Sequence, residues 1–191
     1  MVDAARSRVT YAEYVSIAND SNVKYEFVSG HIVAMAGGTI AHARLIGRVT
    51  SILDRALEGK PCIVLPSDMR VRIRAADRAT YPDLFVVCGE PERDADDDHA
   101  VVNPTVIVEV LSDSSNDFDR TDKFAAYRRL ASLREYLLVS QRERRVEIYR
   151  RDGRRWYLDE VGPGEGARIE SLAIDIAVND VYVDRVGVIV E

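Results

Sequence analysis

The chain of 191 residues contains few of the residues that build disulfide or zinc sites. It has two cysteines, Cys62 and Cys88, and three histidines. Two cysteines cannot form a disulfide framework, and no zinc motif of the usual spacing is present, so we expect both cysteines to lie in the core. Glycine and proline are also scarce, with 11 and 6 residues, which disfavours collagen-like and disordered chains.

Segments for export or membrane insertion are missing as well. Charged residues occur throughout residues 1–30, which leaves no apolar signal-peptide region. No apolar run approaches the roughly 20 residues that span a bilayer. We therefore expect a soluble, cytoplasmic protein without a membrane partner, and its length favours a single domain over residues 1–191.

Several signatures of known enzymes are absent. The sequence contains no Gly-x-Ser-x-Gly elbow, no phosphate-binding Gly-x-x-x-x-Gly-Lys loop and no Gly-x-Gly-x-x-Gly fingerprint. The net charge of −6 excludes a polycation that would coat nucleic acid with its whole surface. Carboxylates are the remaining candidates for chemistry. Only three of the 26 Lys and Arg residues are lysines (Lys24, Lys60 and Lys123), so a lysine near such carboxylates is informative.

Hydrophobic periodicity predicts an order of helix, strands, helix and strands. Capping residues at Thr10 and Thr39 precede helices expected over 11–17 and 40–57, and a further helix is expected over 119–131. Strands are expected over 25–28, 31–35, 62–65, 69–74, 84–88, 106–111, 136–139, 146–149 and 155–158, with strand or irregular structure over 172–178. This order predicts an α/β fold in which helices flank a mixed, mainly antiparallel sheet.

Turn residues and charge patterns add detail to these strands. Ser29-Gly30 and Asp152-Gly153 are typical of tight hairpin turns. Residues 69–74 alternate between arginine and apolar residues, so we expect one face of this strand to be exposed to water. The aspartates within 94–98 indicate a solvated loop.

Glu109 is the one charged residue inside the apolar segment 106–111. Burial of an unpaired carboxylate is costly, so Glu109 must be paired, protonated or bound to a cation. If segments 83–88 and 104–109 pair as antiparallel neighbours about their connecting loop, Asp83 lies directly opposite Glu109. Opposed residues have Cβ atoms about 4.5–5.5 Å apart, and two carboxylates so close repel each other unless a cation such as Mg²⁺ lies between them. The alternative is that Asp83 caps a turn and Glu109 meets an arginine.

Lys123 is the third residue of this hypothesis. After the strand the chain passes through a polar stretch over 112–117 and enters the helix expected over 119–131. Asp119 and Lys123 are four residues apart and can pair along that helix, with Tyr127 on the same face. A helix that returns over the strand ends would bring Lys123 to the carboxylates. Otherwise Lys123 forms an ordinary surface ion pair.

The order and spacing of these residues resemble a known family. Tyr81-Pro82-Asp83, residues 108–112 (VEVLS) and Asp119-x-x-x-Lys123 with Tyr127 are similar to the Uma-type putative restriction endonucleases, which belong to the PD-(D/E)XK nuclease superfamily. Residues 25–30, 35–38 and His42 also match, and the resemblance extends from about residue 10 to about residue 180.

The resemblance implies a restriction-endonuclease-like αβββαβ core and a metal-dependent endonuclease that hydrolyses phosphodiester bonds in DNA. It also suggests a homodimer, because nucleases of this kind usually address two strands. Asp83 and Glu109 correspond to the two acids of the superfamily motif. Together with the backbone carbonyl of Val110 they are expected to hold Mg²⁺ or Mn²⁺.

The catalytic lysine departs from the superfamily pattern. The position two residues after the second acid is Leu111, and the resemblance suggests that the lysine has moved to Lys123. There it is expected to position the attacking water or to stabilise the transition state. Glu26 could supply a further carboxylate, and His42 could orient water or contact phosphate.

Two other functions are compatible with the same residues. If the lysine has not moved, a catalytically inactive nuclease-fold module that binds nucleic acid or regulates another protein becomes the better interpretation. A non-nuclease dimeric scaffold, in which Glu109 pairs with an arginine, is a third. The arginines within 70–74 and 142–155 could contact the phosphates of DNA or form solvated strand faces.

Overall fold

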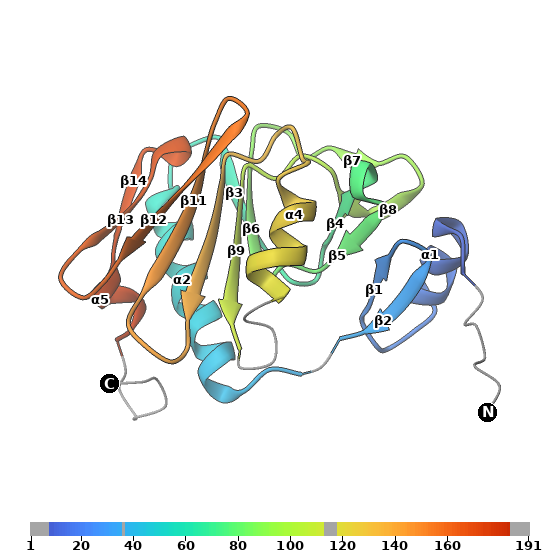
Figure 1. The fold of residues 1–191 in the computed structure, drawn as a ribbon, viewed down its shortest axis with the longest axis horizontal. Coiled ribbons are helices and arrows are strands. Elements are labelled where there is room, and N and C mark those ends of the chain that lie inside the picture. Colours follow the sequence, from blue (N-terminus) through green and yellow to red (C-terminus); the bar gives the residue numbers. More distant parts are fainter. Residues whose placement is uncertain (1–7, 36, 113–117, 184–191) are drawn as a thin grey trace.

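Two six-stranded sheets and a small hairpin form the β-structure (Figure 1). The computed structural model describes residues 8–35, 37–112 and 118–183. The first sheet contains, in spatial order, β2 (His31–Ala34), β1 (Tyr25–Val28), β5 (Arg78–Thr80), β4 (Arg70–Ile73), β8 (Asp97–Val101) and β7 (Arg93–Asp94). The second contains β12 (Arg155–Val161), β11 (Val146–Asp152), β10 (Glu135–Ser140), β9 (Val106–Leu111), β6 (Leu84–Cys88) and β3 (Cys62–Pro66).

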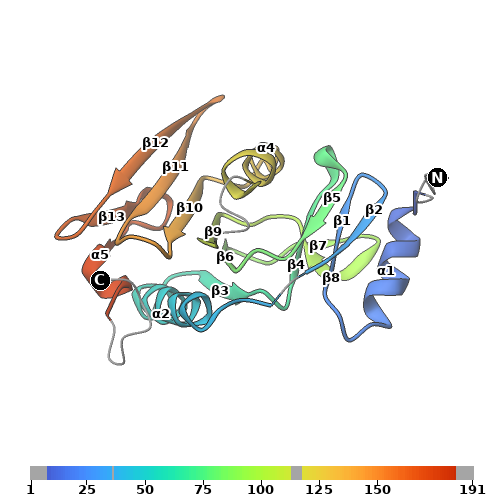
Figure 2. The ribbon, with the colours of Figure 1, turned by 60° about the horizontal axis from the view of Figure 1, so that its bottom comes forward.

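Helices cover the second sheet on both faces (Figure 2). On one face α2 (Ile40–Ala56) packs against alternate residues of the central strands, together with the hairpin of β13 (Gly166–Ile169) and β14 (Ile174–Ala177) and the short α5 (Val178–Val181). On the other face α4 (Phe124–Tyr127) packs against the remaining residues. Burial on both faces explains why β6 and β9 are almost entirely apolar.

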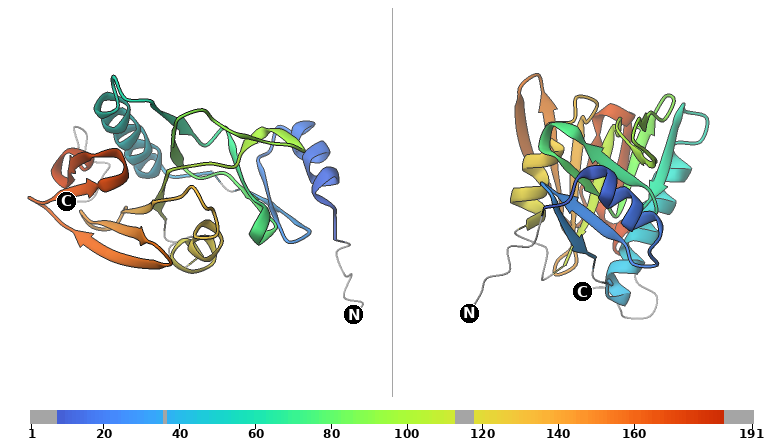
Figure 3. Two further views of the ribbon diagram at one scale, coloured as in Figure 1. Left: turned by 90° about the horizontal axis from the view of Figure 1, so that it is seen from above. Right: turned by 90° about the vertical axis from the view of Figure 1, so that its right-hand side faces the viewer.

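The N-terminal helix packs at one end of the molecule. In α1 (Tyr11–Asn19), a reciprocal capping box between Thr10 and Glu13 fixes the first turn. Tyr14 of α1 packs against Phe27 of β1. Figure 3 shows α1 and the β11–β12 hairpin at opposite ends of the molecule. Three predictions for residues 10–57 are confirmed: the helix after Thr10, the hairpin around Ser29-Gly30, and the helix after Thr39.

The central strands pair in the predicted register. β6 and β9 are antiparallel, with Leu84 opposite Val108 and Val86 opposite Val106. β10 runs parallel to β9, with Glu135 opposite Val106. Most other strand pairs are antiparallel, which confirms the mixed, mainly antiparallel sheet and the α/β class. Because β9 and β10 are parallel, their carboxyl ends lie at the same edge of the sheet.

Two predictions of solvent exposure are wrong for a shared reason, the second of them only in part. The arginine face of β4 is buried: Arg70 is 1% exposed and its guanidinium lies 2.7 Å from Asp97. In the stretch 94–98, Asp94 of β7 and Asp97 of β8 are buried, whereas Asp96 in the turn between these strands is exposed as expected. Buried Asp94 pairs with Arg74 at 2.7 Å. The arginines within 70–74 and the aspartates within 94–98 form ion pairs with each other. Charged residues that suggest solvent exposure in the sequence are therefore buried in part.

The helix expected over 119–131 is shorter and begins differently. It starts as a π-helical turn, Asp119–Lys123, continues as α4 and ends at Tyr127. Turns with hydrogen bonds between residues three apart follow, for example from the amide of Leu130 to the carbonyl of Tyr127. Most of the expected polar loop, residues 113–117, lies outside the described residues. The π-helical turn matters for the site, because such turns often occur where side chains are functional.

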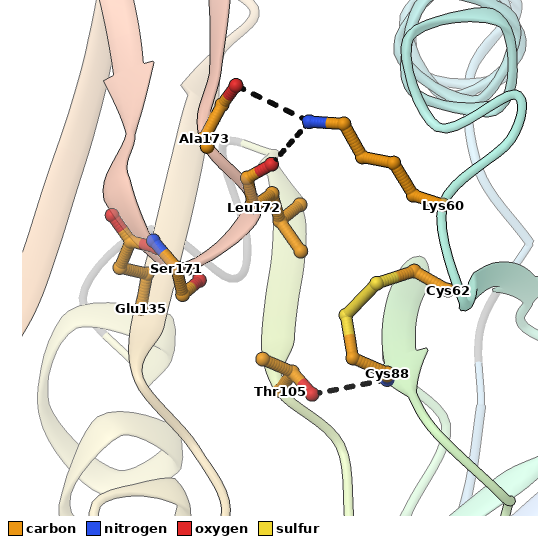
Figure 4. Close-up of a disulfide and its surroundings, with 8 residues drawn as sticks. All are labelled: Lys60, Cys62, Cys88, Thr105, Glu135, Ser171, Leu172 and Ala173. Carbon is orange, nitrogen blue, oxygen red and sulfur yellow. Dashed lines mark hydrogen bonds between the residues drawn. A yellow bond between two sulfur atoms is a disulfide. The ribbon is translucent and has the colours of Figure 1, made fainter.

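The two cysteines form a disulfide, which corrects the expectation that they are separate core residues (Figure 4). Cys62 of the edge strand β3 lies directly opposite Cys88 of β6, with Cα atoms 4.0 Å apart. The amide of Cys88 donates to the hydroxyl of Thr105 at 3.1 Å. The disulfide therefore links β3 covalently to β6, which lies next to β9 in the sheet.

The C-terminal segments also differ slightly from expectation. β11 and β12 pair as far as Asp152 opposite Arg155, so Gly153 and Arg154 are the two turn residues. The alternating tail over 172–178 contains β14 and the first residue of α5. Within the described part of the chain, no helix combines the length and hydropathy that a membrane crossing requires.

Candidate active site

The pairing of β6 with β9 brings Asp83 to Glu109. Asp83 immediately precedes β6, and the register of the pair, continued by one residue, sets it opposite Glu109. Two hydrogen bonds connect the strand ends: the amide of Val110 donates to Asp83 Oδ2 at 2.7 Å, and the amide of Asp83 donates to Glu109 Oε2 at 3.3 Å. The two carboxylates therefore share one end of the sheet, on the face that α4 covers.

Lys123 reaches these carboxylates from the π-helical turn. Its Nζ lies 3.1 Å from Glu109 Oε1 and 3.0 Å from Asp119 Oδ1. Burial alone would lower the pKa of Lys123, but the charges of Glu109 and Asp119 raise it above its ordinary value. Lys123 is therefore held as an ammonium. The scaffold hypothesis required an arginine as the partner of Glu109, and the partner found is Lys123.

Glu109 is buried at the centre of this group. Its side chain also accepts a hydrogen bond from the Tyr127 hydroxyl at 2.9 Å. Burial raises the pKa of Glu109 to about 8; Lys123 offsets part of this effect, and the negative charge of Asp83 adds to it. The surroundings of Glu109 therefore disfavour its ionised form, and a further positive charge nearby would favour it.

Glu26 and His42 complete the set predicted from the sequence. Glu26 of β1 accepts a hydrogen bond from the amide of Tyr81 at 3.0 Å, and burial raises its pKa. His42, in the first turn of α2, places Nε2 3.2 Å from Asp83 Oδ2. The hydrogen bond to Asp83 raises the pKa of His42, and the backbone of Val110 adds to this effect.

All five predicted side chains line one pocket of about 810 Å³. Its charged lining, within the described residues, consists of four carboxylates and two permanent cations besides His42: Glu26, Asp83, Glu109, Asp119, Lys123 and Arg142. The carboxylates outnumber the permanent cations by two when all are ionised. The pocket is therefore short of positive charge.

The donor groups fit a divalent cation, although no three His, Cys, Asp or Glu side chains in the described ranges form a ready metal cluster. The amide of Val110 donates to Asp83 and the amide of Asp83 donates to Glu109, so both carboxylates lie at the same strand ends, and oxygen ligands are those that Mg²⁺ prefers. In this structure His42, a cation when protonated, lies against Asp83 and the Val110 backbone. His42 therefore lies beside the proposed ligands and adds positive charge there when it is protonated.

Two residues of the site were missed as site members. Asp119 is almost fully buried and fixes Lys123; its i, i+4 spacing to Lys123 was the available signal. Gln141 follows β10 and connects two elements, donating to the carbonyl of Leu111 at 2.8 Å and accepting from Thr39 at 2.9 Å. Nothing in the sequence indicates Gln141, because its position depends on the parallel pairing of β9 and β10.

The arginines divide into structural and pocket-lining groups. Arg70 and Arg72 are buried in ion pairs, so they are not available to DNA. A second pocket of about 120 Å³ adjoins the first and shares Ser112, Gln141 and Arg142 with it. Its other basic residues are Arg120 and Arg145.

Comparisons with known proteins agree with this fold. A model of the Uma2 family, described as "Putative restriction endonuclease", matches residues 11–179. Two uncharacterized proteins of Synechocystis sp. are similar over 171 residues, which is 89% of this chain: sll1609 at 38% identity over 96% of its length, and slr1290 at 30% over 89%. The crystal structure of a putative nuclease of DUF820 from Anabaena variabilis has a TM-score of 0.74 at 14% identity, covering 91% of this chain and 97% of that one, and so shares its fold.

The neighbouring glycines at 37 and 38 allow a matched test of how His42 is positioned. A Cβ atom at Gly38 would lie 2.6 Å from Nδ1 of His42, whereas one at Gly37 would meet nothing within 4 Å. We expect Gly38→Ala to displace His42 from Asp83, and Gly37→Ala to leave the contact intact. Ring ¹⁵N chemical shifts, assigned with His42→Gln, report the contact in metal-free protein. Identical His42 shifts in the two alanine variants would show that Gly38 has no such role.

Proposed function

Because the chain belongs to the Uma2 family of putative restriction endonucleases, we propose that it is a metal-dependent endonuclease that hydrolyses phosphodiester bonds in DNA. In this proposal the chain acts as one nuclease-like domain, and a homodimer would offer one pocket to each strand of DNA. The proposed substrate favours a cytoplasmic location, in which the Cys62–Cys88 pair would be mostly reduced.

The charge imbalance of the pocket is the observation that carries the proposal. Four carboxylates and two permanent cations line it, so ionisation of all four carboxylates meets an electrostatic barrier. A divalent cation such as Mg²⁺ or Mn²⁺ would remove this barrier. It would also satisfy Glu109, whose burial otherwise raises its pKa to about 8. The group of carboxylates thus favours a bound divalent cation.

Asp83, Glu109 and the backbone carbonyl of Val110 are the proposed metal ligands. Asp83 is fixed by the amide of Val110, and Glu109 by the amide of Asp83 and the hydroxyl of Tyr127. When bound, the metal would polarise the phosphodiester and lower the pKa of a water molecule. The ligands come from adjacent strands of the central sheet, so their separation is set by backbone pairing rather than by a loop.

Lys123 is proposed to act on the reacting phosphate or on the attacking water. Its ammonium is held charged and in place by Glu109 and Asp119, and a preorganised cation needs no reorganisation when negative charge develops. His42 would orient water or contact phosphate at the start of α2. Glu26 would add a further carboxylate from β1.

The second pocket supports DNA as the substrate. It adjoins the proposed reaction site, and Arg120, Arg142 and Arg145 line it. Arg145 is paired with Glu143, which also lines this pocket. Both Arg120 and Arg145 are paired with Glu147, so part of this charge is balanced within the protein. Arg142, which lines both pockets, is the exposed member best placed to contact a phosphate next to the one that is cleaved.

The metal ligands are tested by calorimetric titration with Mg²⁺ and Mn²⁺. We expect Asp83→Asn and Glu109→Gln each to weaken binding by at least about 100-fold, because each removes a charged oxygen ligand. These amides preserve shape, and thermal melts check that the variants fold. Asp175→Asn, at an exposed position on β14, serves as the control and should bind as the wild type does. Unchanged affinity in both site variants would remove the metal site from the proposal.

A cleavage assay of the Lys123→Gln variant distinguishes an active nuclease from an inactive nuclease-fold module. We expect Lys123→Gln to retain metal binding and to cleave DNA at least about 100-fold more slowly, because a fixed positive charge is lost from the transition state. Lys60→Gln, which removes a lysine that binds the carbonyl of Leu172 elsewhere, should cleave normally. A wild-type protein that binds metal and DNA without cleaving it would instead favour the inactive nucleic-acid-binding or regulatory module.

The salt dependence of DNA binding tests Arg142. Loss of one phosphate contact should reduce the slope of log K against log salt by about 0.7–0.9. We expect this reduction for Arg142→Gln. Arg154→Gln is the matched control, because Arg154 lies in the β11–β12 turn, at the far end of β11 from the site. Equal slopes for the two variants would contradict a phosphate contact at Arg142.

A further inference from the structure

The pocket has an apolar wall that phosphodiester chemistry alone does not use. Val33 of β2 and Phe118, which directly precedes the π-helical turn, both line it. Val33 is 48% exposed and Phe118 is 39% exposed, so both are among the most exposed large apolar side chains of the described residues. Exposed apolar surface next to a functional site is typical of a surface that a ligand covers.

The ring of Phe118 is anchored on the protein side. The guanidinium of Arg78 lies 5.8 Å from the ring centroid, within the range of a cation–π interaction. Arg78 is itself held, because its Nη1 donates to the carbonyl of Asp122 at 3.2 Å. A ring restrained in this way loses little further freedom when a ligand stacks on it.

The neighbouring residues define the chemistry of such a ligand. Phe118 is adjacent in sequence to Asp119, which binds Lys123 at 3.0 Å, so the aromatic surface is next to the proposed reaction centre. A volume of about 810 Å³ far exceeds a phosphate group and is typical of sites for larger molecules. A molecule that carries both a phosphodiester and a flat apolar face is a nucleotide.

A base in a regular duplex cannot use this surface. Its two faces are covered by the neighbouring bases, and an enzyme reaches it only when it is unpaired or turned out of the stack. Aromatic side chains bind unpaired bases by stacking with little dependence on sequence. The exposed ring therefore favours a strand with accessible bases over an intact duplex.

We propose that the pocket binds an unpaired nucleotide, with its base stacked on Phe118 and its phosphate beside the metal that Asp83 and Glu109 would hold. The preferred substrate is then single-stranded or locally unpaired DNA. This inference rests on the proposed function and specifies its substrate. Val33 of β2, which also lines the pocket, would cover the edge of the stacked base.

Binding of single-stranded oligonucleotides tests the stacking site. Fluorescence anisotropy with Ca²⁺ in place of Mg²⁺ measures affinity for a single strand and for the corresponding duplex. We expect tighter binding of the single strand, and a loss of about 5- to 100-fold in Phe118→Ala, the effect of one base stack. Phe118→Tyr should bind as the wild type does. Tyr157→Ala is the matched control, because Tyr157 is 50% exposed on β12 and does not line the pocket.

An abasic nucleotide identifies the contact directly. One abasic position is moved along the strand, and at the position next to the cleaved phosphate the difference between wild type and Phe118→Ala should disappear. A difference that persists at every position would overturn the inference, as would equal single-strand affinities for wild type and Phe118→Ala.

Metal titration of Phe118→Ala separates this inference from the proposed function. We expect unchanged Mg²⁺ affinity. Metal-dependent cleavage of duplex DNA that is indifferent to Phe118 would overturn the inference and leave the nuclease intact. Phe118-dependent binding of single strands without any cleavage would uphold the nucleotide site and refute the enzyme.

Discussion

The antiparallel pairing of β6 with β9 is the constraint on which the site depends. It fixes Asp83 opposite Glu109, and the amides of Val110 and Asp83 then hold the two carboxylates at the end of the sheet. The negative charge of Asp83 repels that of Glu109 and adds to the effect of burial, which raises the pKa of Glu109. The backbone ladder of two buried strands supplies the stability that opposes this repulsion. Lys123 reduces the repulsion further but does not abolish it.

The central part of the fold and of the site could be predicted from the sequence. The apolar segments that became β6 and β9 allow few registers that bury both faces, and the one that sets Asp83 opposite Glu109 is the one found. Lys123 was identifiable because lysine is rare in this chain and lies four residues after Asp119. Their chemical roles stay predictions, because geometry brings the groups together without showing what they do.

Other features could not be predicted, because they depend on partners far away in sequence. The sequence predicts that Arg70 is exposed to solvent, because nothing near it in sequence indicates that Asp97 neutralises it inside the first sheet. Cys62 and Cys88 looked independent because only the pairing of β3 with β6 makes them opposed. The π-helical turn at Asp119 leaves no periodic signal of its own, since one turn is too short to alter the pattern of apolar residues. Sequence patterns describe local environment well and long-range neutralisation poorly.

The parallel arrangement of β9 and β10 has an evolutionary consequence. It brings the connections after both strands, at Ser112 and Gln141, to the rim of the same pocket while the carboxylates stay in the sheet below. Surface connections tolerate insertion and substitution far better than buried strands do. A lineage could therefore lengthen or recharge either connection, and so change which molecules enter, without altering the packing that sets the two acids side by side. Changes of preference in these connections would then leave the two acids in place.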